Sequence, residues 1–481
     1  MAYRSQGRRS CDQCHSKKQR CNWTTGAFQC ERCIRLHLVC QKNRLPRKTY
    51  RQRRGPQSSA QSSRPPARPA EKASNDHTSP ESSSYASSWP IERLDAVGAS
   101  LTAPELERKL SGDLSNGDLH LLKRIIFDDE FLGQFIIGSS FYKPHQDCLV
   151  SHLLSSKIAL LDAYMALALV SSNRSNSLPD GSELNDGLRR ASSAVSTLRC
   201  FKVRDTQDAA VCLVLGATLL TFSLKLGIFD ASTICVQTIS LVKPVYKLMC
   251  DVQSEELGFL HYLVLTDITE CLLQTKVPTL RLEFPNTTTH VDRYVGLCAT
   301  LLPYLHDICE LSAMLHESDG ALDVAERQKA LELSIQEWSP SLSDELADLF
   351  TATEVTHMVC QAKVMQTAAL LVLLRLRCPF GSQLDLALDL VSTILDQLDM
   401  TLQATGRVPC SVDLPLLIAC LELQDEAERA EWLRKLSPIG AYSSSFYEQI
   451  KEKLSAIWTA RRRFPNLCWY HLGSVRSPTS Q

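Results

Sequence analysis

The chain has 481 residues, and its 52 Lys and Arg almost balance its 53 Asp and Glu, which gives a formal net charge of -1. This length allows a large buried core and disfavours the short secreted domain in which dense cysteines form a disulfide framework. Long apolar stretches, such as 158–170 and 368–377, are interrupted by Asp162 and Arg375 and are shorter than the roughly 18 residues of a membrane span. We therefore predict no membrane segment.

Charge is distributed very unevenly along the chain. Residues 1–57 contain fifteen Lys and Arg against Asp12 and Glu31, a net charge of +13, whereas the remainder has 37 basic and 51 acidic residues. A basic head on an acidic body indicates interaction with nucleic acid through the head.

Six cysteines in the basic head repeat one half-motif, C-x2-C-x6-C, with an eight-residue spacer between the copies. Six ligands are too many for one tetrahedral zinc ion. Two zinc ions need eight thiolate contacts, so two sulfurs must each bridge both metals. The spacing thus predicts a binuclear zinc cluster in a DNA-binding domain at 1–42, with the ligands Cys11, Cys14, Cys21, Cys30, Cys33 and Cys40. So small a domain would depend on its metal for folding.

The two halves of this cluster differ in chemistry. The segment after Cys14 is polar and cationic, HSKKQR, whereas the segment after Cys33 is mostly apolar, IRLHLV. Lysine can donate to guanine O6 and N7 in the major groove, so the first segment suits DNA and the second suits packing. A disulfide framework, a RING-like site and a metal store are the alternatives, and the spacing, the N-terminus and the basic tract disfavour them.

These residues resemble the fungal Zn2Cys6 transcription factors. The resemblance implies that Cys11 and Cys30 bridge the two zinc ions and that a helix after the first C-x2-C reads a triplet such as CGG in double-stranded DNA. It also implies that Lys18 reads bases and that Lys17 and Arg20 contact the backbone. The sequence departs from the family pattern at His15, where Arg is usual, and in the spacer NWTTGAFQ, which lacks the usual proline.

A basic tract at 43–57 and a Ser/Pro-rich segment at 58–98 follow the cluster. The tract can lie along phosphates or act as a nuclear localisation signal, with a merely solvated linker as the alternative; its cations include Arg47, Lys48, Arg51, Arg53 and Arg54. The Ser/Pro-rich composition predicts a disordered linker. Ile91, Leu94 and Leu101 give too few heptads for a coiled coil, so we expect a homodimer, if one forms, through the larger domain.

Residues 99–474 predict a large all-α regulatory domain. Apolar residues recur three and four positions apart in the segments 206–227, 232–250, 254–273, 291–315, 354–377, 384–403 and 445–464. Gly227 is a plausible C-cap, and Pro244 should kink or divide its segment. We expect Asp128, Asp129 and Glu130 to form the wet face of one amphipathic helix, with an activation element as the alternative.

Neither catalysis nor a second metal site is predicted. The common nucleotide-binding, metalloprotease and hydrolase motifs are missing, and His261, His290, His306 and His357 show no ligand spacing. The thirteen cysteines beyond residue 40 lie mostly in apolar segments and are expected to be free and buried.

The sequence therefore predicts a nuclear, zinc-dependent regulator of RNA polymerase II transcription and not an enzyme. The resemblance suggests the pathway regulator of a secondary-metabolite gene cluster, with transcriptional co-regulators as partners. The alternative is a DNA-tethered protein-interaction scaffold or co-repressor that acts through the helical domain.

Overall fold

A computed structural model of the chain describes residues 102–171, 181–227, 231–251, 254–284, 291–317, 322–340, 346–438 and 442–475. The chain divides into two units, Met1–Trp89 and Pro90–Gln481, and every described residue belongs to the second. The predicted zinc cluster, basic tract and linker therefore lie outside the described residues. The described part contains eighteen α-helices and four short 3-10 helices, and its only β-pairing is an isolated bridge. The predicted all-α class of the large domain is confirmed.

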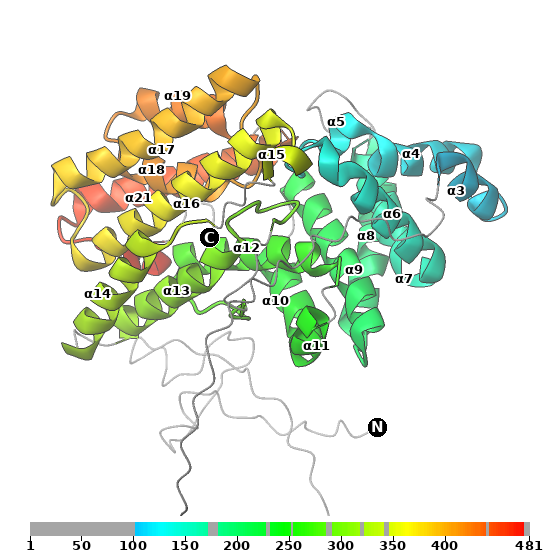
Figure 1. The fold of residues 1–481 in the computed structure, drawn as a ribbon, viewed down its shortest axis with the longest axis horizontal. Helices are drawn as coiled ribbons and strands as arrows, with labels where there is room; N and C mark the ends of the chain where they lie inside the picture. The colour runs from blue at the N-terminus through cyan, green and yellow to red at the C-terminus, as the bar shows by residue number, and fades with distance from the viewer. Residues whose placement is uncertain are drawn as a thin grey trace, which may run out of the picture. The chain divides into compact units, whose positions relative to one another are not determined.

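The first helices of the domain gather on one side of it (Figure 1), where α7 packs against both α8 and α9. Their bounds are α3 (Ala103–Leu110), α4 (Asn116–Phe127), α5 (Asp129–Leu132), η1 (Ser139–Phe141), α6 (Tyr142–Ser155), α7 (Lys157–Val170), α8 (Gly181–Cys200) and α9 (Thr206–Leu226).

The middle helices connect the two sides, because α12 packs against α9 and α10 and also against α13. Their bounds are α10 (Ala231–Val242), η2 (Lys243–Val245), α11 (Tyr246–Asp251), α12 (Leu257–Gln274), η3 (Ala299–Leu301), α13 (Leu302–Glu317) and α14 (Leu322–Glu337).

The last helices form the other side of the domain in Figure 1, around the long helix α16, which packs against α14, α17 and α18. Their bounds are α15 (Leu346–Leu349), α16 (Ala352–Arg377), α17 (Leu384–Thr405), α18 (Asp413–Glu422), α19 (Glu426–Leu436), α21 (Ser444–Arg463) and η4 (Trp469–Ser474).

Helix α9 forms where the sequence predicts it, with both ends set by local chemistry. The Asp205 side chain accepts a hydrogen bond from the Asp208 amide at the N-terminus. Gly227 ends the helix in the left-handed conformation, with φ 64°. Nearly every side chain of α9 is buried, so its stability comes from packing on all sides. Pro244 divides the next predicted helix into α10 and α11 through η2, also as expected.

The prediction of one helix over 291–315 is wrong for its first part. The Asp292 carboxylate accepts hydrogen bonds from the amides of Tyr294 (2.8 Å) and Val295 (2.9 Å), which closes a tight turn in place of a helical turn. Gly296 has φ 56°, a left-handed conformation that a helix cannot contain. The α-helix therefore begins only at Leu302.

The expectation of one continuous helix around Asp128 is also wrong. Helix α4 ends at Phe127, and the Asp128 side chain then caps α5 by accepting from the Glu130 amide at 2.9 Å. Ile125 and Ile126 are buried in the core, which favours the structural role of this segment over an activation element.

A buried ion pair explains the charge inside the apolar segment 368–377. Arg375 on α16 makes a two-pronged contact with Glu422 on α18, with Nε–Oε1 at 2.5 Å and Nη2–Oε2 at 2.9 Å. Both side chains are almost fully buried, at 0% and 1% exposure. The remaining Arg375 nitrogen donates to the carbonyls of Pro379 and Ser382, so the guanidinium is satisfied without water.

Two helices, α9 and α16, are long and apolar enough to cross a membrane by length and composition. The domain buries 89% of the apolar window of α9 and 78% of that of α16. Such burial is typical of core helices, whose apolar surface is covered by protein.

Candidate functional site

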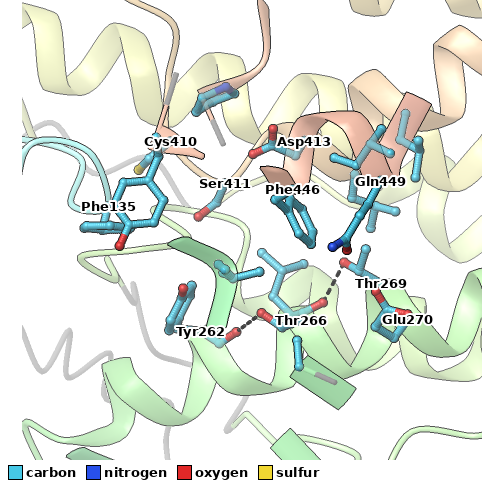
Figure 2. A pocket seen from close by; sticks show the side chains of 18 of the residues that line it. Phe135, Tyr262, Thr266, Thr269, Glu270, Cys410, Ser411, Asp413, Phe446 and Gln449 are labelled. Carbon is cyan, nitrogen blue, oxygen red and sulfur yellow. Dashed lines mark hydrogen bonds between the residues drawn. The ribbon is translucent and has the colours of Figure 1, made fainter. Parts of the chain in front are cut away.

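The described residues line a cavity of about 330 Å³, partly open to solvent, between α12, α18 and α21 (Figure 2). One wall is a single face of α12, because Tyr262, Thr266, Thr269 and Leu273 are spaced three and four residues apart. The opposite wall comes from Phe446, Gln449, Ile450 and Lys453 on α21 and from Leu414 and Leu417 on α18.

Hydrogen bonds to the end of α9 fix the position of α21 at this cavity. The Ser443 hydroxyl accepts from the Phe446 amide as the N-cap of α21, and it donates to the Lys225 carbonyl at 2.8 Å. The Lys225 ammonium donates in turn to the Tyr442 carbonyl at 2.7 Å. Gln449 donates to the Gly227 carbonyl. Helices more than 200 residues apart in sequence thus form one rim.

Several polar groups of the cavity wall offer only hydrogen-bond acceptors. The Thr266 and Thr269 hydroxyls donate to the carbonyls of Tyr262 (3.0 Å) and Leu265 (2.8 Å), as Figure 2 shows, so each has only acceptor capacity left. The Glu270 carboxylate accepts from Gln274 at 2.9 Å and lies 3.6 Å from the Lys453 ammonium.

Asp413 adds a second carboxylate to the wall, and it accepts from the Ser437 hydroxyl at 2.8 Å. Lys453 is the one basic side chain in the lining, and Glu270 already neutralises it. The lining therefore has an excess of negative charge.

Aromatic rings form the inner end of the cavity. Phe135 meets Tyr442 edge to face at 4.7 Å, and Tyr262 stacks on Tyr294 at 5.1 Å. Phe135 and Tyr262 also line a second, smaller cavity of about 60 Å³. Burial raises the pKa of Tyr262, so its hydroxyl stays protonated.

The Tyr262 hydroxyl is buried without a well-directed hydrogen bond. The hydroxyl of its neighbour Thr221 donates to the Ala217 carbonyl instead.

The loop before α18 closes the cavity with Cys410 and Ser411. Ser411 has φ 57°, an uncommon conformation for a residue with a side chain. The Gln361 amide holds the loop by donating to the Cys410 carbonyl at 2.7 Å. Burial raises the pKa of the Cys410 thiol to about 12, so this sulfur is a neutral packing group.

The described part of the chain also contains two small clusters of metal-ligand residue types, which the sequence did not reveal. In the first, His152 Nε2 lies 2.6 Å from Glu256 Oε1, and Cys148 is close by. Burial tends to raise the pKa of Glu256, but hydrogen bonds from His152 and Ser254 outweigh it and lower the pKa to about 2. Burial raises the pKa of Cys148 to about 12. The Glu256 carboxylate is thus already satisfied by hydrogen bonds within the protein, whereas His152 Nδ1 is buried without a hydrogen-bond partner among the described residues.

The second cluster joins His306 to Asp307 and Glu310 on one turn of α13. Arg281 donates two hydrogen bonds to Asp307, at 2.7 and 2.9 Å. Burial tends to raise the pKa of Asp307, but Arg281 and His306 lower it to about 2. The spacing H-D-x-x-E was the available sequence signal, although the arginine makes it an ion-pair network.

The thirteen cysteines beyond residue 40 are free, and nine of them are buried. That expectation is confirmed. The six predicted zinc ligands and the predicted DNA contacts, in contrast, all lie outside the described residues. The structure therefore places none of them.

Comparison with protein families identifies the class of protein, which the described residues alone do not. A model described as the fungal specific transcription factor domain matches residues 126–477, which is most of the chain and includes every helix that lines the cavity. A model described as the fungal Zn(2)-Cys(6) binuclear cluster domain matches residues 9–50. No curated protein and no solved structure matched the chain.

The chain belongs to the fungal Zn2Cys6 transcription factors. It is a DNA-binding regulator of transcription that binds two zinc ions, and its family is not an enzyme family. The family implies that it acts in the nucleus. The donor set fits the metal, because six cysteine thiolates can complete two tetrahedral zinc sites when two of them are shared.

Proposed function

We propose that the chain is a sequence-specific regulator whose zinc cluster reads a CGG-like triplet in the major groove. The observation that carries this proposal is the doubled C-x2-C-x6-C motif, in which only the first copy encloses a cationic segment. Cys11 and Cys30 would bridge the metals, and Cys14, Cys21, Cys33 and Cys40 would each bind one.

The proposed contacts divide by type. Lys18 donates to base edges, while Lys17 and Arg20 bind phosphates and His15 takes the place of the usual arginine beside them. Arg47, Lys48, Arg51, Arg53 and Arg54 would add affinity without sequence preference, through the release of counterions. The same basic residues would serve as the nuclear localisation signal.

The helical domain would determine when and with which partners the bound chain acts. We propose regulation of a biosynthetic gene cluster for a secondary metabolite, supported by the family resemblance, and recruitment of co-regulators through this domain. Because residues 91–101 contain too few heptads for a coiled coil, a homodimer would have to form through the helical domain. Light scattering of the zinc-loaded chain with and without DNA measures this stoichiometry.

Fluorescence anisotropy with duplex DNA tests the base-reading assignment. Lys18→Ala should remove the preference for a CGG duplex over one with the triplet changed, while zinc content stays at two ions per chain. Lys42→Ala is the matched control, because it removes the same charge outside the reading segment and should retain the preference. An unchanged preference in Lys18→Ala would show that another residue reads the bases.

A salt titration tests the basic tract separately. Replacing Arg51, Arg53 and Arg54 with Gln should weaken binding to all duplexes alike and flatten the dependence of affinity on salt concentration. A change in sequence preference would instead assign these side chains to base contacts.

A reporter gene under a bound promoter decides the sign of regulation. Loss of transcript with a Cys14→Ala chain supports an activator. A rise in transcript supports the alternative, a DNA-tethered scaffold or co-repressor.

A further inference from the structure

We propose that the cavity between α12, α18 and α21 binds a small, largely apolar organic molecule that carries hydrogen-bond donors and no negative charge. The ligand would be of aromatic, two- to three-ring size and would be neutral or cationic. Such a ligand would make the helical domain responsive to a metabolite, in addition to the DNA-binding role of the chain.

The size and walls of the cavity favour a ligand over a packing defect. A volume of about 330 Å³ corresponds to roughly ten water molecules and reaches the range typical of small-molecule sites. Aromatic and aliphatic side chains offer such waters few hydrogen bonds, so an apolar molecule that displaces them would gain affinity; these side chains include Phe135, Leu265, Leu273, Leu417, Phe446 and Ile450.

The side chains on the facing helices are left partly uncovered by the protein itself. On α21, only Leu454, Ile457 and Ala460 are fully buried. Ile450 and Phe446, one and two turns nearer the N-terminus than Leu454, are partly buried at the cavity, as are Thr266 and Thr269 on the facing helix α12. An apolar ligand would complete the burial of both faces.

The polar groups define which ligand fits. Thr266 and Thr269 have only acceptor capacity to offer, and Glu270 and Asp413 contribute carboxylates. Lys453 is paired with Glu270, so it would have to break that contact to bind an anion. A hydroxyl or amine on the ligand would therefore be favoured, and a carboxylate would be disfavoured by the like charge of Glu270 and Asp413.

The inner end of the cavity offers one further group. The Tyr262 hydroxyl is buried without a well-directed hydrogen bond at the boundary between the two cavities. A ligand edge that reaches between Phe135 and Tyr262 would offer this hydroxyl a better-directed partner than Thr221 and would stack against the rings.

The test compares two probes of the same ring system, 2-naphthol and 2-naphthoate, by calorimetric titration of the zinc-loaded full chain. We expect saturable one-to-one binding of 2-naphthol and at least tenfold weaker binding of 2-naphthoate. Absence of saturable 2-naphthol binding up to its solubility limit, or equal binding of both probes, would overturn the proposal.

A second experiment fills the cavity with a larger side chain. Thr266→Phe should weaken 2-naphthol binding at least tenfold. Thr356→Phe is the matched control, because Thr356 also donates to the carbonyl four residues before it but is exposed on α16, and its substitution should leave binding unchanged. Thr269→Phe repeats the test if Thr266→Phe does not fold. Unchanged binding in the folded cavity variants would place the probe elsewhere and contradict the proposal.

Neutralising the wall tests the charge argument. Glu270→Gln should strengthen the binding of 2-naphthoate and thereby reduce the affinity ratio between the two probes several-fold. An unchanged ratio would show that charge does not select the ligand. DNA affinity, which depends on the zinc cluster, reports independently on the proposed function in every variant.

Discussion

The cysteine-rich head and the helical body of this chain encode their structures in opposite ways. In the head, six residues of one type at fixed spacing define the metal content and the class of protein, because metal coordination is local and demands particular donors. In the body, one continuous core spreads stability over apolar residues from Leu106 to Leu472. A local pattern can therefore identify function in the head, whereas the body reveals its chemistry only after folding.

Removal of zinc should have the largest effect, and it should affect the head without affecting the helical domain. Chelation, or Cys14→Ser, should reduce specific DNA affinity at least a hundredfold, because zinc binding supplies the folding free energy of so small a domain. The thermal transition of the helical domain should not move. Loss of both DNA affinity and the thermal transition of the helical domain would show that the two regions do not fold independently.

Breaking the buried ion pair should have the opposite effect: it should destabilise the helical domain and leave the head unaffected. Arg375→Met should destabilise the helical domain by about 3–5 kcal/mol, because the buried Glu422 carboxylate loses both of its hydrogen bonds from Arg375 and keeps only Arg461, 4.0 Å away, as a charged partner. Arg375→Met with Glu422→Leu should recover most of the loss. Urea unfolding measures both.

The matched control for Arg375 lies two residues away on the same helix. Arg377 pairs with Glu332 at 3.0 Å and is half exposed, so Arg377→Met should cost less than about 1 kcal/mol. Equal costs at the two positions would contradict the account of the buried pair.

A substitution at the close contact between α9 and α10 should destabilise the domain less than the loss of the buried ion pair. A Cβ at Gly216 on α9 would clash with the Thr238 side chain on α10. Gly216→Ala should therefore destabilise the domain by about 1–3 kcal/mol through overpacking. Gly112→Ala has nothing within 4 Å and should be neutral or slightly stabilising in the same urea measurement.

The most gradual effect should come from pH. Burial, reinforced by Arg407, lowers the pKa of His357 from 6.5 to about 4. The neutral side chain is therefore favoured in the folded state, so its contribution is complete above pH 6.5 and is lost as the pH falls toward 4. The slope should be at most about 1.4 kcal/mol per pH unit.

Unfolding midpoints between pH 7 and pH 4 measure this slope. His357→Gln should flatten it, and His120→Gln, at an exposed position on α4, should not. A slope that is the same in all three chains would assign the acid sensitivity to other groups.

In the helical body, the sequence predicted those helix ends and breaks that depend on neighbouring residues. The C-cap of α9 at Gly227 and the break at Pro244 were both predicted from the sequence, and both are confirmed. The errors at 291–301 and at Asp128 have one cause. A side-chain carboxylate there bonds to backbone amides and ends or delays a helix that hydrophobic spacing alone would continue.

Long-range features could not be predicted from the sequence. Arg375 was read as an interruption of an apolar run, because its partner Glu422 lies 47 residues away. The cavity was missed for the same reason, since its walls come from α12 and α21 and depend on how helices pack. Polar residues on one face of α12 look like a solvated face until the opposite wall is known.

Selection of DNA from a random pool by the zinc-loaded full chain tests the central claim most directly. The account predicts enrichment of a CGG-like triplet, loss of that enrichment on zinc chelation, and loss in Lys18→Ala but not in Lys42→Ala. A pool without an enriched motif, or an enrichment that survives chelation, would contradict it.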